Sequence, residues 1–147
     1  MITATRYHDF SYGHRVHGHE GACTHLHGHN GRAHFTVRPV AGLDAMGRVL
    51  DFSVIKTRLC DWLEQHWDHR FLIYEQDPWA SDLKLLDPEG VVLVGFNPTA
   101  ERMAQHLLHI VGPAQLQHTH CLLESVVVEE TRKCAATARH PTFNLLT

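Results

Sequence analysis

Residues 49–67 read VLDFSVIKTRLCDWLEQHW, and the apolar side chains in this stretch recur at the spacing of one helix face. Asp51 or Ser53 is suited to cap its first turn. A second apolar stripe follows the Asn-Pro-Thr sequence at 97–99, which is typical of a helix start. We expect that helix to end at the Gly-Pro pair at 112–113. The sequence therefore predicts two helices in the middle of the chain.

Strands are expected on both sides of the helices. Residues 2–12 alternate in character and predict a strand that ends near His14, and residues 34–38 predict a second strand that stops near Pro39. The polar, glycine-rich stretch 15–31 between them is expected to be a long loop or an irregular hairpin connection. Residues 122–128 alternate again, and a short last strand is expected near 135–139.

The order strand, strand, helix, helix, strand, strand favours an α+β fold. In such a fold the two helices cover one face of a four-stranded antiparallel sheet. The connection at residues 74–98 contains prolines and short apolar runs, so we expect a loop with a short strand at Val91–Val94. The chain of 147 residues has the common size of one domain, so residues 1–147 are expected to form a single domain.

Charge and cysteine usage exclude several classes of protein. With 13 basic and 16 acidic side chains the formal net charge is -3, so no global positive field gathers nucleic acid or anionic lipid. No stretch approaches the roughly 20 apolar residues that cross a bilayer, and no secretory leader is visible, so we expect a cytoplasmic protein without a membrane partner. The 4 cysteines form no CxxC pair and are expected to be free thiols.

Histidine is the unusual residue of this sequence. The chain contains 15 histidines, and they concentrate between His8 and His34. His27 and His29 are two residues apart, so on an extended backbone both imidazoles point to the same side. His14 ends the first predicted strand, where a neighbouring strand can bring it alongside. Three histidines without a fourth side-chain ligand are typical of catalytic zinc, whose open position takes water or substrate.

Simpler explanations exist for each pattern taken alone. The same histidine spacing occurs at His17/His19 and at His118/His120, so spacing does not decide which pairs bind metal. An Asp-His step such as Asp68-His69, directly after a helix, is often only a partner of the helix dipole. The glutamates of Glu129-Glu130 can both be solvated at a strand end. These alternatives stay open on the residues themselves.

Six motifs occur in a fixed order along the chain. They are FSYGHRV at 10–16, CTHLHGHN at 23–30, LDAMGRVLDF at 43–52, WDH at 67–69, NPTAE at 97–101 and VVVEET at 126–131. Together they resemble the 6-pyruvoyl/6-carboxy-tetrahydropterin synthase family over nearly the whole chain. The cysteine that three residues separate from HGH is similar to the bacterial 6-carboxy-tetrahydropterin synthase branch, an early step towards queuosine and other deazapurines.

The resemblance implies a tunnelling fold (T-fold) with two helices and four strands, whose subunits assemble around a barrel. It also implies a homo-oligomer, commonly a dimer of trimers, that acts on a small-molecule pterin triphosphate. The implied site consists of zinc held by His14, His27 and His29, Cys23 as catalytic base, Asp68 with His69 as the remaining catalytic pair, and Glu130 as the carboxylate that anchors the pterin.

These implied roles agree with the chemistry of a dihydropterin triphosphate. A carboxylate accepts the paired N–H groups of an amino-pyrimidine edge bidentately. A nearby metal favours the thiolate of Cys23, and an Asp-His pair suits a proton relay. The first hypothesis is the carboxy-forming lyase, the second is the pyruvoyl-forming synthase, and the third is a non-catalytic metal- or pterin-binding protein. No basic residue can be ranked as a triphosphate ligand.

The chain departs from the usual family pattern at a few positions. Gly31 stands where an aromatic residue is common, Trp67 replaces a leucine, and Arg102 replaces an asparagine. None of these changes removes a residue of the implied site. The segment 74–96 is longer than in compact members of the family.

Overall fold

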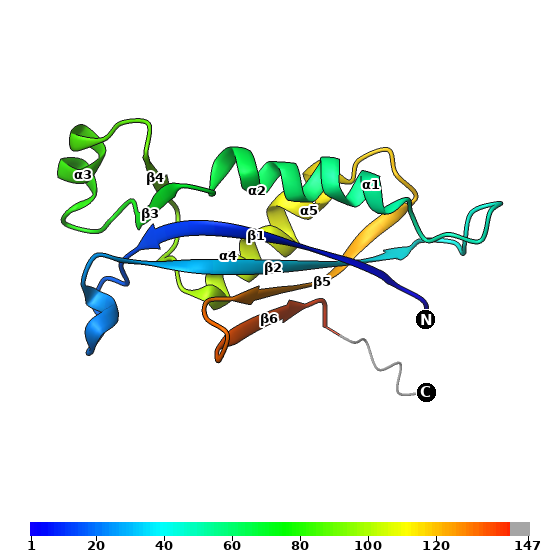
Figure 1. Cartoon of the computed structure of the whole chain (residues 1–147), viewed down its shortest axis with the longest axis horizontal. Helices are drawn as coiled ribbons and strands as arrows, with labels where there is room; N and C mark the ends of the chain where they lie inside the picture. The colour runs from blue at the N-terminus through cyan, green and yellow to red at the C-terminus, as the bar shows by residue number, and fades with distance from the viewer. Residues whose placement is uncertain (142–147) are drawn as a thin grey trace.

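Two long strands form the centre of the protein, which is described by a computed structural model over residues 1–141. β1 (Ala4–His14) and β2 (His27–Pro39) pair antiparallel along their whole length (Figure 1). The other elements, in chain order, are the 3₁₀ helix η1 (Ala22–Thr24), α1 (Phe52–Ile55), the π-helical η2 (Lys56–Cys60), α2 (Asp61–His66), β3 (Arg70–Tyr74), α3 (Ala80–Leu86), β4 (Val91–Val94), α4 (Ala100–His106), the π-helical η3 (Leu107–Val111), α5 (Gly112–Gln115), β5 (Cys121–Glu129) and β6 (Ala135–Arg139).

The sheet is mixed and has six strands in the order β4-β3-β1-β2-β5-β6. β1, β2, β5 and β6 were expected and pair antiparallel with one another, and β4 coincides with the short strand expected at Val91–Val94. β3 was not expected; it pairs parallel with both β1 and β4 and so adds a parallel edge to the sheet. The expectation of a four-stranded antiparallel sheet was therefore incomplete. The α+β class is confirmed.

β3 and α3 were not predicted from the sequence. β3 is a run of five residues without alternation that follows a helix directly, and Leu72 and Ile73 are both fully buried. A short apolar run of this kind cannot be told from the end of a buried helix. α3 has no side-chain cap, and its Leu85 and Leu86 are exposed, so it lacks an amphipathic stripe.

The start of β2 was also predicted wrongly. The strand begins at His27, inside the stretch that was expected to be a loop up to Gly31. Its glycines permit close approach of β1, because a Cβ on Gly28 would lie 3.0 Å from the backbone oxygen of Tyr12. A Cβ on Gly31 would lie 2.8 Å from the Tyr12 ring. The histidine pair is thus part of a regular strand.

Both predicted helical stretches form, each with one π-helical turn in its middle. The Asp51 side chain accepts a hydrogen bond from the Ser53 N–H, and Thr99 caps the second stretch by accepting one from the Arg102 N–H. The second stretch does not end at Gly112-Pro113 as expected but continues to Gln115. The wide π-helical turn before Pro113 relieves the clash between the proline ring and the preceding turn.

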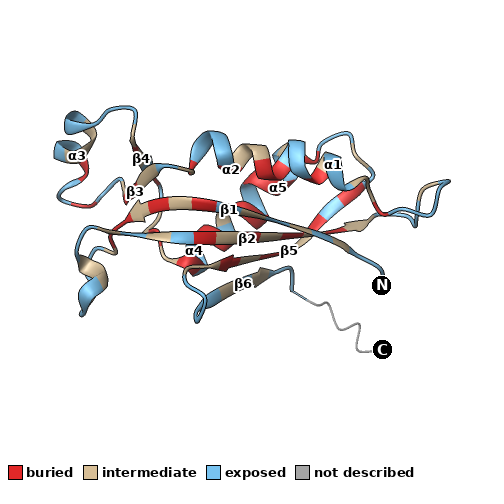
Figure 2. Ribbon diagram, in the orientation of Figure 1, coloured by how far each residue is buried: buried red, intermediate tan, exposed pale blue. Residues whose placement is uncertain are grey.

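The core lies between the two helical stretches and one face of the sheet (Figure 2). Phe10, Phe35 and Val126 from three strands share a single buried cluster with Leu59 and Met103 from the helices. The opposite face of β1 and β2 carries polar side chains. Within residues 1–141, no helix is both long and apolar enough to cross a membrane.

Candidate metal centre

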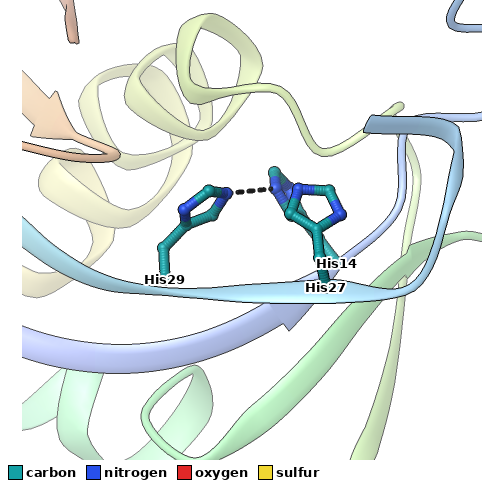
Figure 3. A group of neighbouring side chains, drawn as sticks. All are labelled: His14, His27 and His29. Atoms are coloured by element: carbon teal, nitrogen blue, oxygen red, sulfur yellow. Dashed lines mark hydrogen bonds between the residues drawn. The ribbon is translucent and has the colours of Figure 1, made fainter. Parts of the chain in front are cut away.

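The three predicted metal ligands meet where β1 ends and β2 begins. His14 lies opposite His27 in the strand register, and Tyr12 lies opposite His29. Because directly opposed residues point to the same face, all three imidazoles lie on the side of the sheet that carries the helices. One potential ligand atom from each histidine lies within 4.8 Å of the others (Figure 3).

Hydrogen bonds on the far side of two rings fix which nitrogen faces the centre. Nδ1 of His14 lies 2.7 Å from the Pro98 carbonyl oxygen, and Nδ1 of His27 lies 2.7 Å from the His25 carbonyl oxygen. A carbonyl only accepts, so each Nδ1 carries the proton and each Nε2 presents a lone pair. Backbone carbonyls orient metal-bound histidines in the same way in other proteins.

The unpaired nitrogens show that the cluster fits a cation. Nε2 of His27 is buried and has no hydrogen-bond partner within residues 1–141. Nε2 of His14 lies 3.1 Å from Nε2 of His29, a separation at which two lone pairs repel unless a proton or a metal ion lies between them. Three imidazoles that converge through Nε2 form a donor set that zinc prefers.

Burial keeps the imidazoles of His14 and His29 neutral near pH 7. Desolvation lowers the pKa of His14 to about 4, although the hydrogen bond to Pro98 opposes this shift. Desolvation also lowers the pKa of His29, and here the negative charge of Glu130 opposes it. Neutral imidazole is the form that binds a metal, so these two side chains are ready to bind one without releasing a proton.

Glu130 joins the histidines, whereas Glu129 does not. Glu130 Oε1 lies 3.4 Å from Nε2 of His14 and 3.4 Å from Nε2 of His29. Glu129 ends β5 on the other face of the sheet, where its carboxylate pairs with Nε2 of His34. The structure therefore places the two adjacent glutamates on opposite faces, as the strand alternation predicts.

Cys23 reaches the same region from η1. The residue is half-buried, and its carbonyl oxygen accepts a hydrogen bond of 2.8 Å from the Val16 N–H. A cavity of about 330 Å³ is lined by Cys23 together with Glu130, Glu101 and Cys134. The position of Cys134 in this cavity could not be predicted, because no sequence motif links the β5–β6 turn to η1.

Asp68 and His69 lie elsewhere in the same chain. They line a cavity of about 760 Å³ together with Asp9, Ser11 and Asn30, whose side chains point away from the helices. One chain therefore brings His14, His27 and His29 together with Glu130, and Cys23 shares a cavity with that glutamate. The Asp68-His69 pair lies on the other side of β1 and β2.

The Asp68-His69 pair is nonetheless well ordered by local contacts. Asp68 Oδ1 accepts a hydrogen bond of 2.8 Å from the Ser11 N–H, and Oδ2 lies 2.8 Å from His69 Nδ1. Burial alone would raise the pKa of Asp68, but these contacts outweigh it and lower the pKa. His69 adopts a left-handed backbone conformation, with φ of 56°, that is uncommon outside glycine. The pair thus presents an exposed imidazole backed by a carboxylate.

Two further features of this region were not predicted from the sequence. The buried Tyr12 hydroxyl has no hydrogen-bond partner within residues 1–141, and burial followed by the charge of Glu130 raises its pKa, so it stays protonated beside the histidines. Gly31, which departs from the family pattern, leaves room for the Tyr12 ring. Neither His17/His19 nor His118/His120 belongs to a group of three possible metal ligands in the described part of the chain.

Comparison with known proteins agrees with this geometry. The family model of 6-pyruvoyl tetrahydropterin synthase matches residues 3–141. The chain belongs to this family. Among curated members, the 6-carboxy-5,6,7,8-tetrahydropterin synthase of Rickettsia typhi is 30% identical over 135 residues, which cover 91% of this chain and 97% of that protein. A probable 6-carboxy-5,6,7,8-tetrahydropterin synthase of Halobacterium salinarum is 35% identical and covers 82% of this chain and 75% of its own.

Solved structures of synthase family members and relatives share the fold. An uncharacterized protein from Wolinella succinogenes superposes with a TM-score of 0.83 at 25% identity, covering 95% of this chain and 98% of that one. The 6-pyruvoyl tetrahydropterin synthase of Caenorhabditis elegans superposes with a TM-score of 0.65 at 22% identity, covering 95% of this chain and 96% of that one. The T-fold expected from the resemblance is therefore confirmed for this synthase family member.

Proposed function

We propose that this chain is a zinc-dependent 6-carboxy-5,6,7,8-tetrahydropterin synthase of a deazapurine pathway such as that to queuosine. It converts 7,8-dihydroneopterin triphosphate and water to 6-carboxy-tetrahydropterin, acetaldehyde and triphosphate. The observation that carries this proposal is the convergence of three histidines, Glu130 and Cys23 at one end of the sheet. The names of the curated bacterial and archaeal relatives favour the carboxy-forming reaction.

His14, His27 and His29 would hold the zinc through their Nε2 atoms. A metal ion held by these three side chains would supply a Lewis acid for a side-chain hydroxyl of the substrate, which would acidify the adjacent C–H. The Pro98 and His25 carbonyls keep two of the rings in the metal-binding tautomer. The reaction needs no external redox partner, because the side chain as a whole loses the two electrons that the pterin ring gains. When the bond between its first two carbons breaks, the first carbon is oxidised to the carboxylate with oxygen from water and the second to the aldehyde carbon of acetaldehyde. The third carbon is reduced to the methyl group as triphosphate leaves.

Cys23 is assigned as the base and Glu130 as the pterin anchor. The Cys23 thiolate accepts the proton from the substrate side chain, and its cavity is shared with Glu130. The Glu130 carboxylate accepts two N–H groups from the amino-pyrimidine edge of the pterin, which fixes the side chain next to the thiol. The Tyr12 hydroxyl is an additional donor beside this carboxylate.

Asp68 and His69 would act from a second copy of the chain. They lie on the opposite face of β1 and β2 from the histidine cluster, so one subunit does not assemble all the proposed groups. A homo-oligomer, which the family resemblance implies as a dimer of trimers, can bring the His69 imidazole of one subunit to the Cys23 cavity of another. His69 then donates or accepts the second proton, and Asp68 orients it.

The second candidate is the pyruvoyl-forming synthase, which the family name and the Caenorhabditis elegans neighbour favour. The same residues would start both reactions, and only the products differ. A non-catalytic metal- or pterin-binding protein is the third candidate, but binding alone requires neither the thiol nor the Asp-His pair.

The test is incubation of zinc-loaded protein with 7,8-dihydroneopterin triphosphate and identification of the products by mass. A 6-carboxy product supports the proposal, and a pyruvoyl product moves the chain to the second candidate. Cys134→Ala serves as the matched control for Cys23→Ala, since both remove a thiol from the same cavity. The control should keep its turnover.

A further inference from the structure

The Glu130 carboxylate has an unusual environment for a charged group. Its side chain is 25% exposed, and the side chains of residues 1–141 within ion-pair distance of it are the imidazoles of His14 and His29. No hydrogen-bond donor within these residues satisfies its oxygens in another direction. A partly desolvated carboxylate of this kind is costly unless a positive charge lies beside it.

The distances place that positive charge. Zinc binds imidazole nitrogen and carboxylate oxygen at about 2.0–2.2 Å with tetrahedral angles, so neighbouring ligand atoms lie about 3.4 Å apart. The three separations among Nε2 of His14, Nε2 of His29 and Oε1 of Glu130 are 3.1, 3.4 and 3.4 Å. These values match the edges expected for one face of a zinc tetrahedron. Nε2 of His27, which is buried and has no hydrogen-bond partner within residues 1–141, is available as the fourth ligand atom.

We propose that Glu130 is the fourth zinc ligand in the substrate-free enzyme, and that it leaves the ion when it binds the pterin edge. The proposal rests on the zinc site of the proposed function. It gives one carboxylate two successive partners. Recognition of the pterin and opening of the metal to the substrate side chain then become one movement, because the carboxylate cannot satisfy both partners at once.

A competing explanation is an ion pair in the metal-free protein between Glu130 and a protonated histidine. Such an ion pair would leave Nε2 of His27, which is buried and has no hydrogen-bond partner within residues 1–141, without a partner. The ion pair and the metal ligand differ in a measurable way. Loss of a ligand weakens zinc binding, whereas loss of a partner that competes for the imidazoles would strengthen it.

The first test is zinc affinity without pterin, measured by competition with a colorimetric chelator. Glu130→Gln is expected to weaken zinc binding about 10- to 100-fold, in the range seen when groups around a metal are changed. Glu129→Gln is the matched control, because Glu129 lies on the other face and pairs with His34. It should bind zinc like the wild type. Equal or tighter zinc binding by Glu130→Gln would overturn the proposal.

The second test uses the wild-type protein and does not depend on the variant folding. Addition of zinc should shift a carboxylate stretching band in the infrared difference spectrum, and neopterin, which lacks the triphosphate, should reverse that shift. A spectrum without a carboxylate shift overturns the proposal but leaves the proposed function intact if turnover persists. Failure of the wild type to bind zinc at all overturns both.

Discussion

The guanidinium of Arg15 forms a buried, two-pronged ion pair with the carboxylate of Asp77. Nε lies 2.6 Å from Oδ2 and Nη2 lies 2.8 Å from Oδ1. The same guanidinium donates to the Thr24 carbonyl at 3.1 Å and lies 3.5 Å from the ring centre of Trp79. Arg15, the residue after His14, thus contacts Thr24, the residue after Cys23. It also contacts Asp77 and Trp79 in the long connection between β3 and β4.

Asp77→Ala should lower the free energy of unfolding by roughly 3–5 kcal/mol, because it leaves the Arg15 cation buried without a partner. Denaturant unfolding measures this effect. Asp61→Ala, which removes the partner of the exposed Lys56, is the control and should change stability little. If Asp77→Ala lowered the free energy of unfolding no more than the control, the buried ion pair would not contribute to stability.

Acid should destabilise the protein partly through Asp77. Burial raises the pKa of this carboxyl, but the hydrogen bond and the charge of Arg15 outweigh it and lower the pKa below the unfolded value. A carboxyl group whose pKa is lower in the folded than in the unfolded protein stabilises the fold at pH values above its pKa in the unfolded protein. This contribution is lost as the pH falls through its pKa in the folded protein. Asp77→Asn should therefore show a shallower decline of unfolding free energy below about pH 4, near the unfolded pKa of aspartate. An unchanged pH profile would contradict this.

Single substitutions should distinguish the residue that acts as the base from a residue that binds the metal. Cys23→Ala is expected to retain zinc and to bind pterin, but to lose turnover by about 10²- to 10⁴-fold, the usual contribution of a general base. His27→Ala should lose the metal, because it removes one of the three proposed histidine ligands. Metal analysis and calorimetric pterin titration measure these outcomes. Near-normal turnover by Cys23→Ala would exclude the thiolate as base.

Mixing two inactive variants tests whether the site is shared between subunits. Cys23→Ala and Asp68→Asn subunits, unfolded together and reassembled in equal amounts, should recover about a quarter of the wild-type rate, because one in four mixed sites combines two intact contributions. Each variant reassembled alone should stay inactive. Absence of recovery, in oligomers shown by mass to be mixed, would place all the groups in one subunit.

Local patterns in the sequence were enough to predict much of this fold. The alternation of β1 and β5 and the capped, amphipathic helices each depend on neighbours within a few residues. The register that aligns His14 with His27 follows from the same alternation once β2 is extended to its true start.

The remaining features depend on contacts between distant residues. β3 forms because β1 offers it a parallel edge, and the five residues Arg70–Tyr74 cannot encode that choice locally. Arg15 was one of several basic residues that the sequence could not rank, and its partner Asp77 is 62 positions away. The position of Asp68 on the face opposite Cys23 likewise follows from the sheet order.

The most direct test of the account is the amount of acetaldehyde formed per 7,8-dihydroneopterin triphosphate consumed by the zinc-loaded protein. Alcohol dehydrogenase and NADH detect the aldehyde, and chromatography measures the pterin. The proposed carboxy-forming reaction predicts equimolar acetaldehyde, and none when the metal is removed by a chelator. Consumption of the substrate with triphosphate release but without acetaldehyde would contradict it.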